Sequence, residues 1–271
     1  EEKQKMNAFK KILATTLALS IGALSLAGCG GKKTEGTGKA YDKEVMTPGK
    51  LVVGISADYP PYESLGTDGK VEGFDVDMAN ELAKYMGKDG KAIEVEFKNM
   101  DFHSIITALQ AGQIDVGISA FTYDPERDCL FSDTYLTSEQ LVVVSKESGY
   151  KNLNDLTGKK IGAGTETTGA KAAEENIKDA KISSPGDYTV MFEALKTGAL
   201  DAVVCDGQVA KNYVAANSSL EILGDPLVKE ENQIIVKNGN DELLKEINSA
   251  IKQFLASDAP QQLKDKWGIE G

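Results

Sequence analysis

A twelve-residue pattern occurs twice in this chain, and it constrains the fold more than any other feature. The segments ALQAGQIDVGIS (108–119) and ALKTGALDAVVC (194–205) each predict a helix that ends at a glycine and is followed by a strand. A weaker echo precedes each copy, in PGKLVVGIS (48–56) and TGKKIGAGT (157–165). The common order favours two similar α/β lobes in tandem over one continuous sheet. The simpler alternative is that helix–glycine–strand is a common unit.

From residue 51 onward, short apolar runs alternate with helical patterns, which is typical of an α/β fold. Strands are predicted at 51–56, 93–97, 114–119, 161–164 and 201–205, and helices at 74–87, 102–112 and 241–268, the last interrupted at Pro260. The final helix carries one apolar stripe of leucine, isoleucine and phenylalanine. We expect it to close over the core of the first lobe.

The N-terminal part of the chain predicts a secretory signal. Lys10 and Lys11 form a basic region, residues 12–26 are apolar, and the run ends in Leu26-Ala27-Gly28-Cys29. It is too short and too rich in small residues for a membrane helix, but it suits a signal peptide. The ending resembles the bacterial lipobox, in which the cysteine is lipidated and anchors the mature protein. The alternative is a plain signal peptide with an unmodified Cys29.

The chain that follows this signal is acidic. All 271 residues carry a formal net charge of −12, and residues 1–28 hold four lysines and two glutamates, so the rest carries −14. This charge argues against nucleic acid as a partner. Cys129 and Cys205 are too few for a disulfide framework and are expected to be small apolar side chains rather than metal ligands. Residues 29–47 are predicted to be the lipidated cysteine and a flexible tether.

Polar groups follow several predicted strands, at the edge where α/β proteins bind ligands. Arg127 has a planar guanidinium that can hold a carboxylate through two hydrogen bonds. Thr167-Thr168-Gly169 opens a helix and offers backbone N–H groups to an anion. Asp206 ends an apolar strand and would need a cationic partner if buried. With Tyr59 and Phe102 as flat apolar walls, these groups predict a site for a zwitterion such as an α-amino acid.

Each of these groups also has a purely structural interpretation. Arg127 could pair with Asp124 or Glu126 on the surface. Thr167-Thr168-Gly169 could be ordinary helix capping, and Asp206 could cap the helix that begins GQVAKNY. The ligand-binding interpretation therefore depends on their occurrence together, at equivalent places in two lobes.

At these residues the chain resembles a known family. From about Lys50 to Trp267 it is similar to the polar amino acid-binding proteins of bacterial ABC importers, which are family 3 extracellular solute-binding proteins. The matching motifs, in order, are Asp58-Tyr59-Pro60-Pro61-Tyr62, Gly73-Phe74-Asp75-Val76-Asp77, Ala108-Leu109 to Asp115, Thr122 through Pro125-Glu126-Arg127 to Phe131-Ser132-Asp133, Thr167-Thr168-Gly169 and Asp201-Ala202-Val203-Val204 to Asp206. The resemblance implies the α/β, two-lobed type II periplasmic-binding-protein fold, in which each lobe is a mixed sheet flanked by helices.

The resemblance also implies roles for individual residues. Arg127 would bind the α-carboxylate of a free L-amino acid, helped by the backbone N–H groups of Thr122 and Thr168. Asp206 would bind the α-ammonium, assisted by the Ala120 carbonyl and the Thr122 hydroxyl. Tyr59 and Phe102 would flank the ligand side chain, and Ser119, Glu166 and Thr167 complete the expected ligand-binding set.

Three positions depart from the family pattern. Glu166 stands where many relatives have glycine, Gly164 and Thr165 stand where some members carry a side chain that selects the ligand, and Ala120 replaces the usual serine or glycine. Glu166 would either favour a cationic or amide ligand or point to solvent. The resemblance therefore implies a polar amino acid without identifying its side chain.

The family architecture crosses between lobes twice, and we place these crossings near Glu139 and Lys229. Lobe one is then 48–139 plus 230–271, and lobe two is 140–229. A ligand bound between the lobes would favour hinge closure, and the closed form would be recognised by an ABC permease in the membrane. The alternatives are a dehydratase of the same fold and a ligand-sensing module.

Catalytic motifs are missing from the sequence. There is no HExxH, no CxxC and no phosphate-binding loop, and the single histidine, His103, begins a helical run. We therefore expect a binding protein with no catalytic residue, no metal and no cofactor.

Overall fold

The computed structural model describes residues 36–270, which form a ten-stranded mixed sheet flanked by helices. Eight strands follow one another in the spatial order β10 (Lys181–Ser183), β9 (Lys160–Gly162), β11 (Ala202–Asp206), β8 (Leu136–Ser145), β13 (Val228–Val236), β6 (Val116–Thr122), β1 (Lys50–Ile55) and β5 (Glu94–Asn99). Two short strands complete it: β12 (Leu220–Ile222) pairs with β8, and β7 (Leu130–Phe131) pairs with β13. A separate small sheet contains β2 (Asp58–Tyr59), β3 (Glu63–Leu65) and β4 (Val71–Glu72).

The large sheet has two parallel halves joined by two antiparallel strands. β1 is parallel to β5 and β6, and β9 is parallel to β10 and β11. Between these halves, β8 and β13 run antiparallel to each other and to their outer neighbours. The predicted crossing positions Glu139 and Lys229 face each other in the β8–β13 ladder. The repeated helix–glycine–strand pattern thus corresponds to one copy in each half, ending in β6 and β11.

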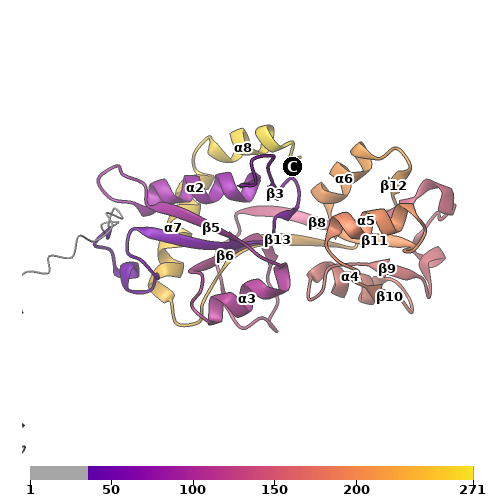
Figure 1. Ribbon diagram of the computed structural model, residues 1–271, viewed down its shortest axis with the longest axis horizontal. Helices are drawn as coiled ribbons and strands as arrows, with labels where there is room; N and C mark the ends of the chain where they lie inside the picture. The colour runs from indigo at the N-terminus through magenta and orange to yellow at the C-terminus, as the bar shows by residue number, and fades with distance from the viewer. Residues whose placement is uncertain (1–35, 271) are drawn as a thin grey trace, which may run out of the picture. The chain divides into compact units, whose positions relative to one another are not determined.

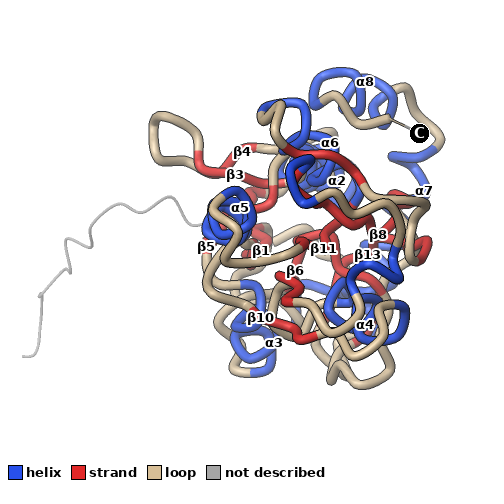
Figure 2. Tube along the Cα trace, turned by 90° about the vertical axis from the view of Figure 1, so that its right-hand side faces the viewer, coloured by secondary structure: helices blue, strands red, loops and turns tan. Residues whose placement is uncertain are grey.

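Helices lie on both sides of this sheet. They are α2 (Phe74–Met86), α3 (Phe102–Gln110), α4 (Thr168–Asn176), α5 (Tyr188–Lys196), α6 (Gly207–Ala216), α7 (Asp241–Leu255) and α8 (Ala259–Trp267), with short 3₁₀ helices at η1 (Ala40–Lys43), η2 (Lys146–Ser148) and η3 (Leu153–Leu156). α6 and α8 lie on one side of the strands and α3 and α4 on the other (Figures 1 and 2).

The C-terminal helix packs on the first half, as its apolar stripe predicts. Leu243, Ile247, Ile251 and Phe254 are buried in α7, which packs against α2 (Figure 1). The predicted interruption is also present, because α7 ends at Leu255 and α8 begins with a proline in its first turn.

The prediction of a flexible tether is wrong for its described end. Residues 40–43 form η1, and Tyr41 is 1% exposed, with its hydroxyl donating to the Met86 carbonyl at 2.9 Å. Burial of this aromatic ring against α2 and α7 orders a segment whose polar composition predicted none. The predictions for residues 1–35, which include the signal peptide and Cys29, lie outside the described residues.

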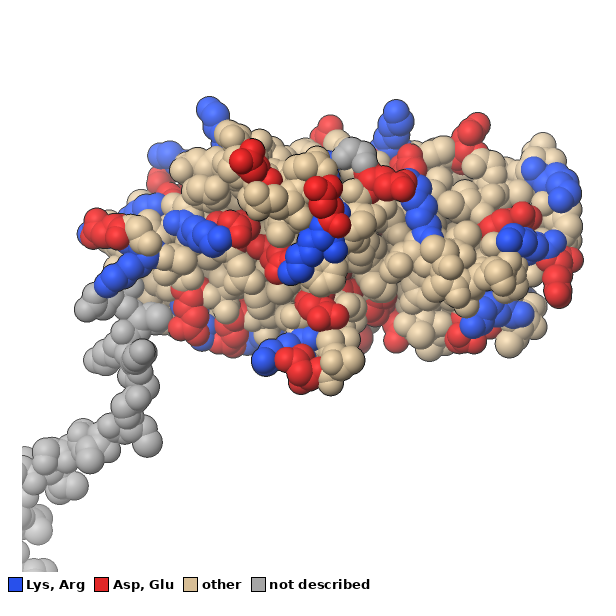
Figure 3. Space-filling model, turned by 90° about the horizontal axis from the view of Figure 1, so that it is seen from above, with Lys and Arg blue, Asp and Glu red and all other residues tan. Residues whose placement is uncertain are grey.

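The distribution of surface charge and the burial of the cysteines agree with the expectations from composition. Acidic and basic side chains are interspersed over the face seen in Figure 3 and form no single basic patch there. Cys205 is fully buried and Cys129 is partly buried. Within residues 36–270, no helix combines the length and apolar character needed to cross a membrane.

Candidate ligand-binding site

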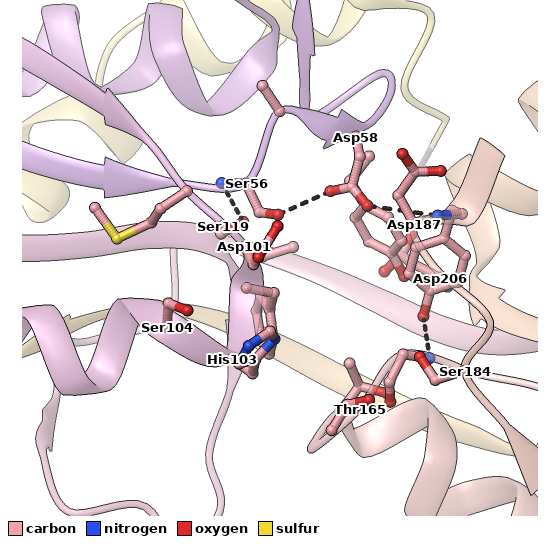
Figure 4. Close-up of a pocket in the computed structure, with 18 of the residues that line it drawn as sticks. Ser56, Asp58, Asp101, His103, Ser104, Ser119, Thr165, Ser184, Asp187 and Asp206 are labelled. Atoms are coloured by element: carbon pink, nitrogen blue, oxygen red, sulfur yellow. Dashed lines mark hydrogen bonds between the residues drawn. The ribbon is translucent and has the colours of Figure 1, made fainter. Parts of the chain in front are cut away.

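A cavity of about 780 Å³ lies where the strand ends of the two halves meet. Residues near the C-terminal end of, or just after, all six parallel strands line it, among them Ser56, Asn99, Ala120, Gly164, Ser184 and Asp206. Ligands of α/β sheets bind beyond the carboxyl ends of the strands, in cavities of roughly 300–1,000 Å³. The cavity therefore has the position and size of a small-molecule site, and Figure 4 shows several of its polar side chains.

Most of the predicted ligand-binding residues line this cavity. They are Tyr59, Phe102, Ser119, Ala120, Thr122, Arg127, Thr167, Thr168 and Asp206. Glu166 differs, because it is exposed and is not among the lining residues. Its backbone carbonyl instead accepts a hydrogen bond from Arg127. Of the two interpretations of Glu166, the structure favours a side chain that points to solvent.

Arg127 is the only arginine of the chain, and its guanidinium is fixed by two carbonyl groups and two rings. Nη1 donates to the Thr122 carbonyl at 2.8 Å, and Nη2 donates to the Glu166 carbonyl at 3.0 Å. The guanidinium carbon lies 5.5 Å from the ring centroid of Phe102 and 5.2 Å from that of Phe121, which is within cation–π range. Burial lowers the pKa of Arg127, but a guanidinium stays protonated in proteins. Its remaining N–H groups are therefore oriented for an anion.

The predicted alternative, a surface pair of Arg127 with an acidic neighbour, does not occur. Asp124 and Glu126 bind the Lys171 ammonium instead, and the Asp124 contact measures 2.6 Å. Lys171 belongs to α4 in the second half, whereas Asp124 follows β6 in the first. Because these carboxylates bind Lys171, they do not pair with the Arg127 guanidinium, which remains available to a ligand. The ion pairs also join the two halves.

Asp206 caps a helix, which is the structural role considered for it, and it also lines the cavity. It is 2% exposed, and its Oδ1 accepts hydrogen bonds from the Tyr62 hydroxyl at 2.8 Å and the Gln208 N–H at 3.0 Å. The second bond makes Asp206 the N-cap of α6. Burial raises the pKa of its carboxyl to about 6, although both hydrogen bonds act in the opposite direction. Both of these bonds go to Oδ1, and the Ser138 hydroxyl beside the carboxyl also lowers its pKa.

An aromatic wall crosses between the halves beside Asp206. The ring of Tyr59 lies 4.8 Å from that of Tyr188, the first residue of α5. The Tyr59 hydroxyl accepts a hydrogen bond from the backbone N–H of Asp206 at 2.8 Å. Tyr62 is fully buried, and its hydroxyl donates a hydrogen bond to Asp206. The structure is therefore a closed form in which both halves contact each other around the cavity.

Two buried carboxyls support the strand end at Ser119 and Ala120. Glu63 and Asp75 are both 0% exposed. Glu63 Oε1 accepts from the Ser119 hydroxyl at 2.6 Å, while Asp75 Oδ2 accepts from the Ala120 N–H at 3.0 Å and the Tyr135 hydroxyl at 2.9 Å. Ala120 has a φ of 46°, a conformation that costs free energy in a non-glycine residue and needs such support.

Each of these two carboxyls has a second oxygen that accepts no hydrogen bond from another described residue. Glu63 Oε2 and Asp75 Oδ1 are buried with no conventional donor, yet the two carboxyls interact. Burial raises the pKa of Glu63 well above its usual range and that of Asp75 to about 6. Because the pKa of Glu63 is raised the more strongly, a proton held by Glu63 and donated to Asp75 would give both oxygens a partner.

Sequence reasoning missed one buried acceptor in the cavity wall. Gln140 lies in β8 directly opposite Asp206 and is 4% exposed. Its Nε2 donates to Glu230 at 2.8 Å, but its Oε1 has no hydrogen-bond partner among the described residues. A buried acceptor without a donor costs roughly 1–3 kcal/mol, which a ligand N–H would offset. Its local sequence resembles any strand, so only the pairing with β11 identifies it.

Comparison with known proteins places these features in context. Residues 51–270 match the profile of the bacterial extracellular solute-binding proteins, family 3. The L-cystine-binding protein TcyJ of Escherichia coli (strain K12) is 31% identical over 229 residues, which cover 83% of this chain and 84% of TcyJ. The arginine-binding extracellular protein ArtP of Bacillus subtilis (strain 168) is 32% identical over 264 residues, which cover 95% of this chain and 98% of ArtP.

A solved structure gives the same result for the fold. The crystal structure of the substrate binding protein of an amino acid ABC transporter superposes with a TM-score of 0.74 at 35% identity. The match covers 82% of this chain and 100% of that protein. These likenesses confirm the predicted two-lobed type II periplasmic-binding-protein fold.

Proposed function

The chain belongs to the bacterial extracellular solute-binding proteins of family 3, and from this premise we propose that it captures a free L-amino acid for an ABC transporter. The observation that carries this proposal is the pairing of a partly buried guanidinium with a buried carboxylate across one cavity. Arg127 lies on the first half and Asp206 on the second. An α-amino acid carries the two opposite charges that this arrangement complements.

In the proposed complex, Arg127 binds the α-carboxylate with its free N–H groups, assisted by the backbone N–H groups of Thr122 and Thr168. Asp206 Oδ2 accepts from the α-ammonium, together with the Ala120 carbonyl and the Thr122 hydroxyl. Charge-assisted hydrogen bonds contribute roughly 1.5–3 kcal/mol each. Two or three of them contribute about 3–9 kcal/mol in total, compared with a binding free energy of about −8 kcal/mol for a micromolar dissociation constant.

Ligand binding then favours closure of the two lobes, 48–139 plus 230–271 and 140–229. The hinge is the β8–β13 pair, because these two strands join the halves. Since the ligand bridges Arg127 and Asp206, it binds the closed form better than the open form and shifts the population toward it. We propose that a membrane permease recognises this closed form.

We further propose that the protein is extracytoplasmic and anchored by lipid at Cys29, on the strength of the Leu26-Ala27-Gly28-Cys29 sequence. We propose binding rather than catalysis, because Arg127 and Asp206, the charged groups that we assign, are complementary to a zwitterion. A sensing role would use the same binding step and differ only in the membrane partner.

Thermal unfolding of the purified protein against the common L-amino acids tests this proposal. A ligand at 100 times its dissociation constant stabilises by about 2.7 kcal/mol, which corresponds to a rise in Tm of roughly 5–10 °C for a chain of this size. We expect such a rise with one or a few amino acids, its loss in Arg127→Ala, and its persistence in Lys178→Ala, where the exposed lysine lies outside the cavity. If no amino acid raises Tm, the zwitterion site is wrong.

A further inference from the structure

The cavity contains more acidic side chains than the binding of an α-amino acid requires. Four aspartates line it, namely Asp58, Asp101, Asp187 and Asp206, whereas Arg127 is the only lysine or arginine among the described lining residues. The proposed function pairs Arg127 with the ligand carboxylate and Asp206 with the ligand ammonium. Three aspartates then remain for the rest of the ligand.

Two of these aspartates come from opposite halves and are near enough to interact electrostatically. Asp58 lies in β2, just after β1, and Asp187 is the N-cap of α5. Asp58 Oδ2 accepts a long hydrogen bond, 3.4 Å, from the N–H of Tyr188, the residue after Asp187. Asp187 is exposed, and its charge is close enough to raise the pKa of the Asp58 carboxyl; Figure 4 labels both side chains in the cavity wall.

The surroundings keep both groups in place as acceptors. Ser56 Oγ donates to Asp58 Oδ1 at 2.8 Å, and the side chain of Asp187 accepts from the Val190 N–H at 2.9 Å, where the helix terminus favours negative charge. Burial raises the pKa of Asp58, as does the nearby Asp187 charge, while the Ser56 and Tyr188 hydrogen bonds lower it. Closure therefore brings two like charges together, and a neutral ligand leaves their repulsion uncompensated.

A separate observation indicates that the occupant supplies donors. Gln140 Oε1 is buried in the cavity wall without a partner among the described residues, beside Asp206. The lining thus presents an unpaired amide oxygen and unneutralised carboxylates, which are all acceptors. A ligand rich in N–H groups satisfies them, and an anionic one does not.

Resting on the proposed function, we propose that the ligand is an amino acid with a cationic side chain, whose positive charge lies between Asp58 and Asp187. The ligand side chain passes the Tyr59 ring on the way from the α-carbon to these carboxylates. The aspartate pair selects the ligand by charge. A cationic side chain offsets the repulsion between the two carboxylates on closure, a neutral side chain leaves it, and an anionic side chain increases it.

Calorimetric titration of the purified protein with L-lysine, L-arginine, L-glutamine and L-glutamate tests this inference. We expect L-lysine or L-arginine to bind at least tenfold more tightly than L-glutamine, and L-glutamate to bind most weakly. Asp58→Asn should weaken the cationic ligand at least tenfold and change L-glutamine less than threefold. Asp68→Asn, which removes the same charge from an exposed loop outside the cavity, is the matched control and should change neither.

The outcomes separate the two proposals. Tight binding of L-glutamine or L-glutamate that Arg127→Ala abolishes and Asp58→Asn leaves unchanged would overturn the cationic ligand and keep the amino acid site. Asp187→Asn tests the same aspartate pair from the second half. Like Asp58→Asn, it should weaken binding of the cationic amino acid. Absence of binding by all four amino acids would overturn the cationic-ligand proposal, and the wider amino acid panel above then decides the function itself.

Discussion

Asp206→Asn should make the ligand-free protein more stable while it removes ligand binding. Folding raises the pKa of the Asp206 carboxyl from an ordinary value of 3.8 to about 6 because the group is buried. About two pKa units correspond to about 3 kcal/mol of unfavourable free energy for the ionised form at pH 7. Asparagine removes the charge but keeps an Oδ1 that can accept from Tyr62 and Gln208, and it is a good N-cap.

The size of the effect depends on pH with a definite sign. Because the folded-state pKa is raised, the carboxyl contributes most to stability below pH 4, where it is protonated in both states, and this contribution is lost as the pH rises through about 6. The contribution of an asparagine at this position to the free energy of unfolding does not depend on pH. We therefore expect the variant to exceed the wild type by about 2 kcal/mol at pH 7, after some loss to its new N–H groups, and the difference to shrink toward pH 4.

Urea unfolding at pH 4, 5, 6 and 7, without ligand, measures this difference directly. Titration with the best amino acid should show at least tenfold weaker binding by the variant, since it lacks the charge that pairs with the ammonium. The reasoning is refuted if Asp206→Asn is less stable than the wild type at pH 7, or if the difference is the same at pH 4 and pH 7.

Two further predictions concern the groups that support the site. Glu63→Gln should unfold within about 0.5 kcal/mol of the wild type, because the amide still accepts from Ser119 and donates to Asp75, whereas Glu63→Ala should cost about 2–4 kcal/mol by leaving both unpaired. Urea unfolding compares them, and equal losses would show that the proton is not carried by Glu63. Lys171→Gln should weaken ligand binding about two- to fivefold and reduce its dependence on salt, because half-exposed ion pairs between the halves contribute up to about 1 kcal/mol to closure. Calorimetry at low and high salt measures this, with Lys196→Gln, whose pair lies within α5, as the control that should leave affinity unchanged.

The sequence predicts the parallel core and much of the site because both depend on local patterns. The strands that become β1, β6 and β11 are short apolar runs, and their helices end at glycines. The hydrophobic periodicity and these glycines are therefore enough to locate the elements. Arg127 and Asp206 follow such strands, which is where an α/β sheet presents its ligand groups.

The parts that were missed depend on pairing over long distances in the chain. Gln140 becomes a site residue only because β8 pairs with β11, and Asp187 meets Asp58 only because α5 begins across the cavity. Tyr41 is ordered by packing against distant helices, which polar composition conceals. Capping by Asp206 is compatible with the proposed ligand binding, since the hydrogen bonds from the tyrosine hydroxyl and from the capped helix both use the single oxygen Oδ1.

The pairing of β8 with β13 also has a consequence for how such proteins diversify. Everything between Glu139 and Lys229 leaves and re-enters the first half at positions that are hydrogen-bonded neighbours, roughly 5 Å apart. That segment is topologically an insert, and a related gene could replace it whole with only two junctions and no change in chain reach. Asp187 and Asp206 would travel with the insert, while Asp58 and Arg127 would stay behind. Recombination at these two points would thus exchange one side of the ligand preference in a single event, without passing through the intermediates that stepwise substitution requires.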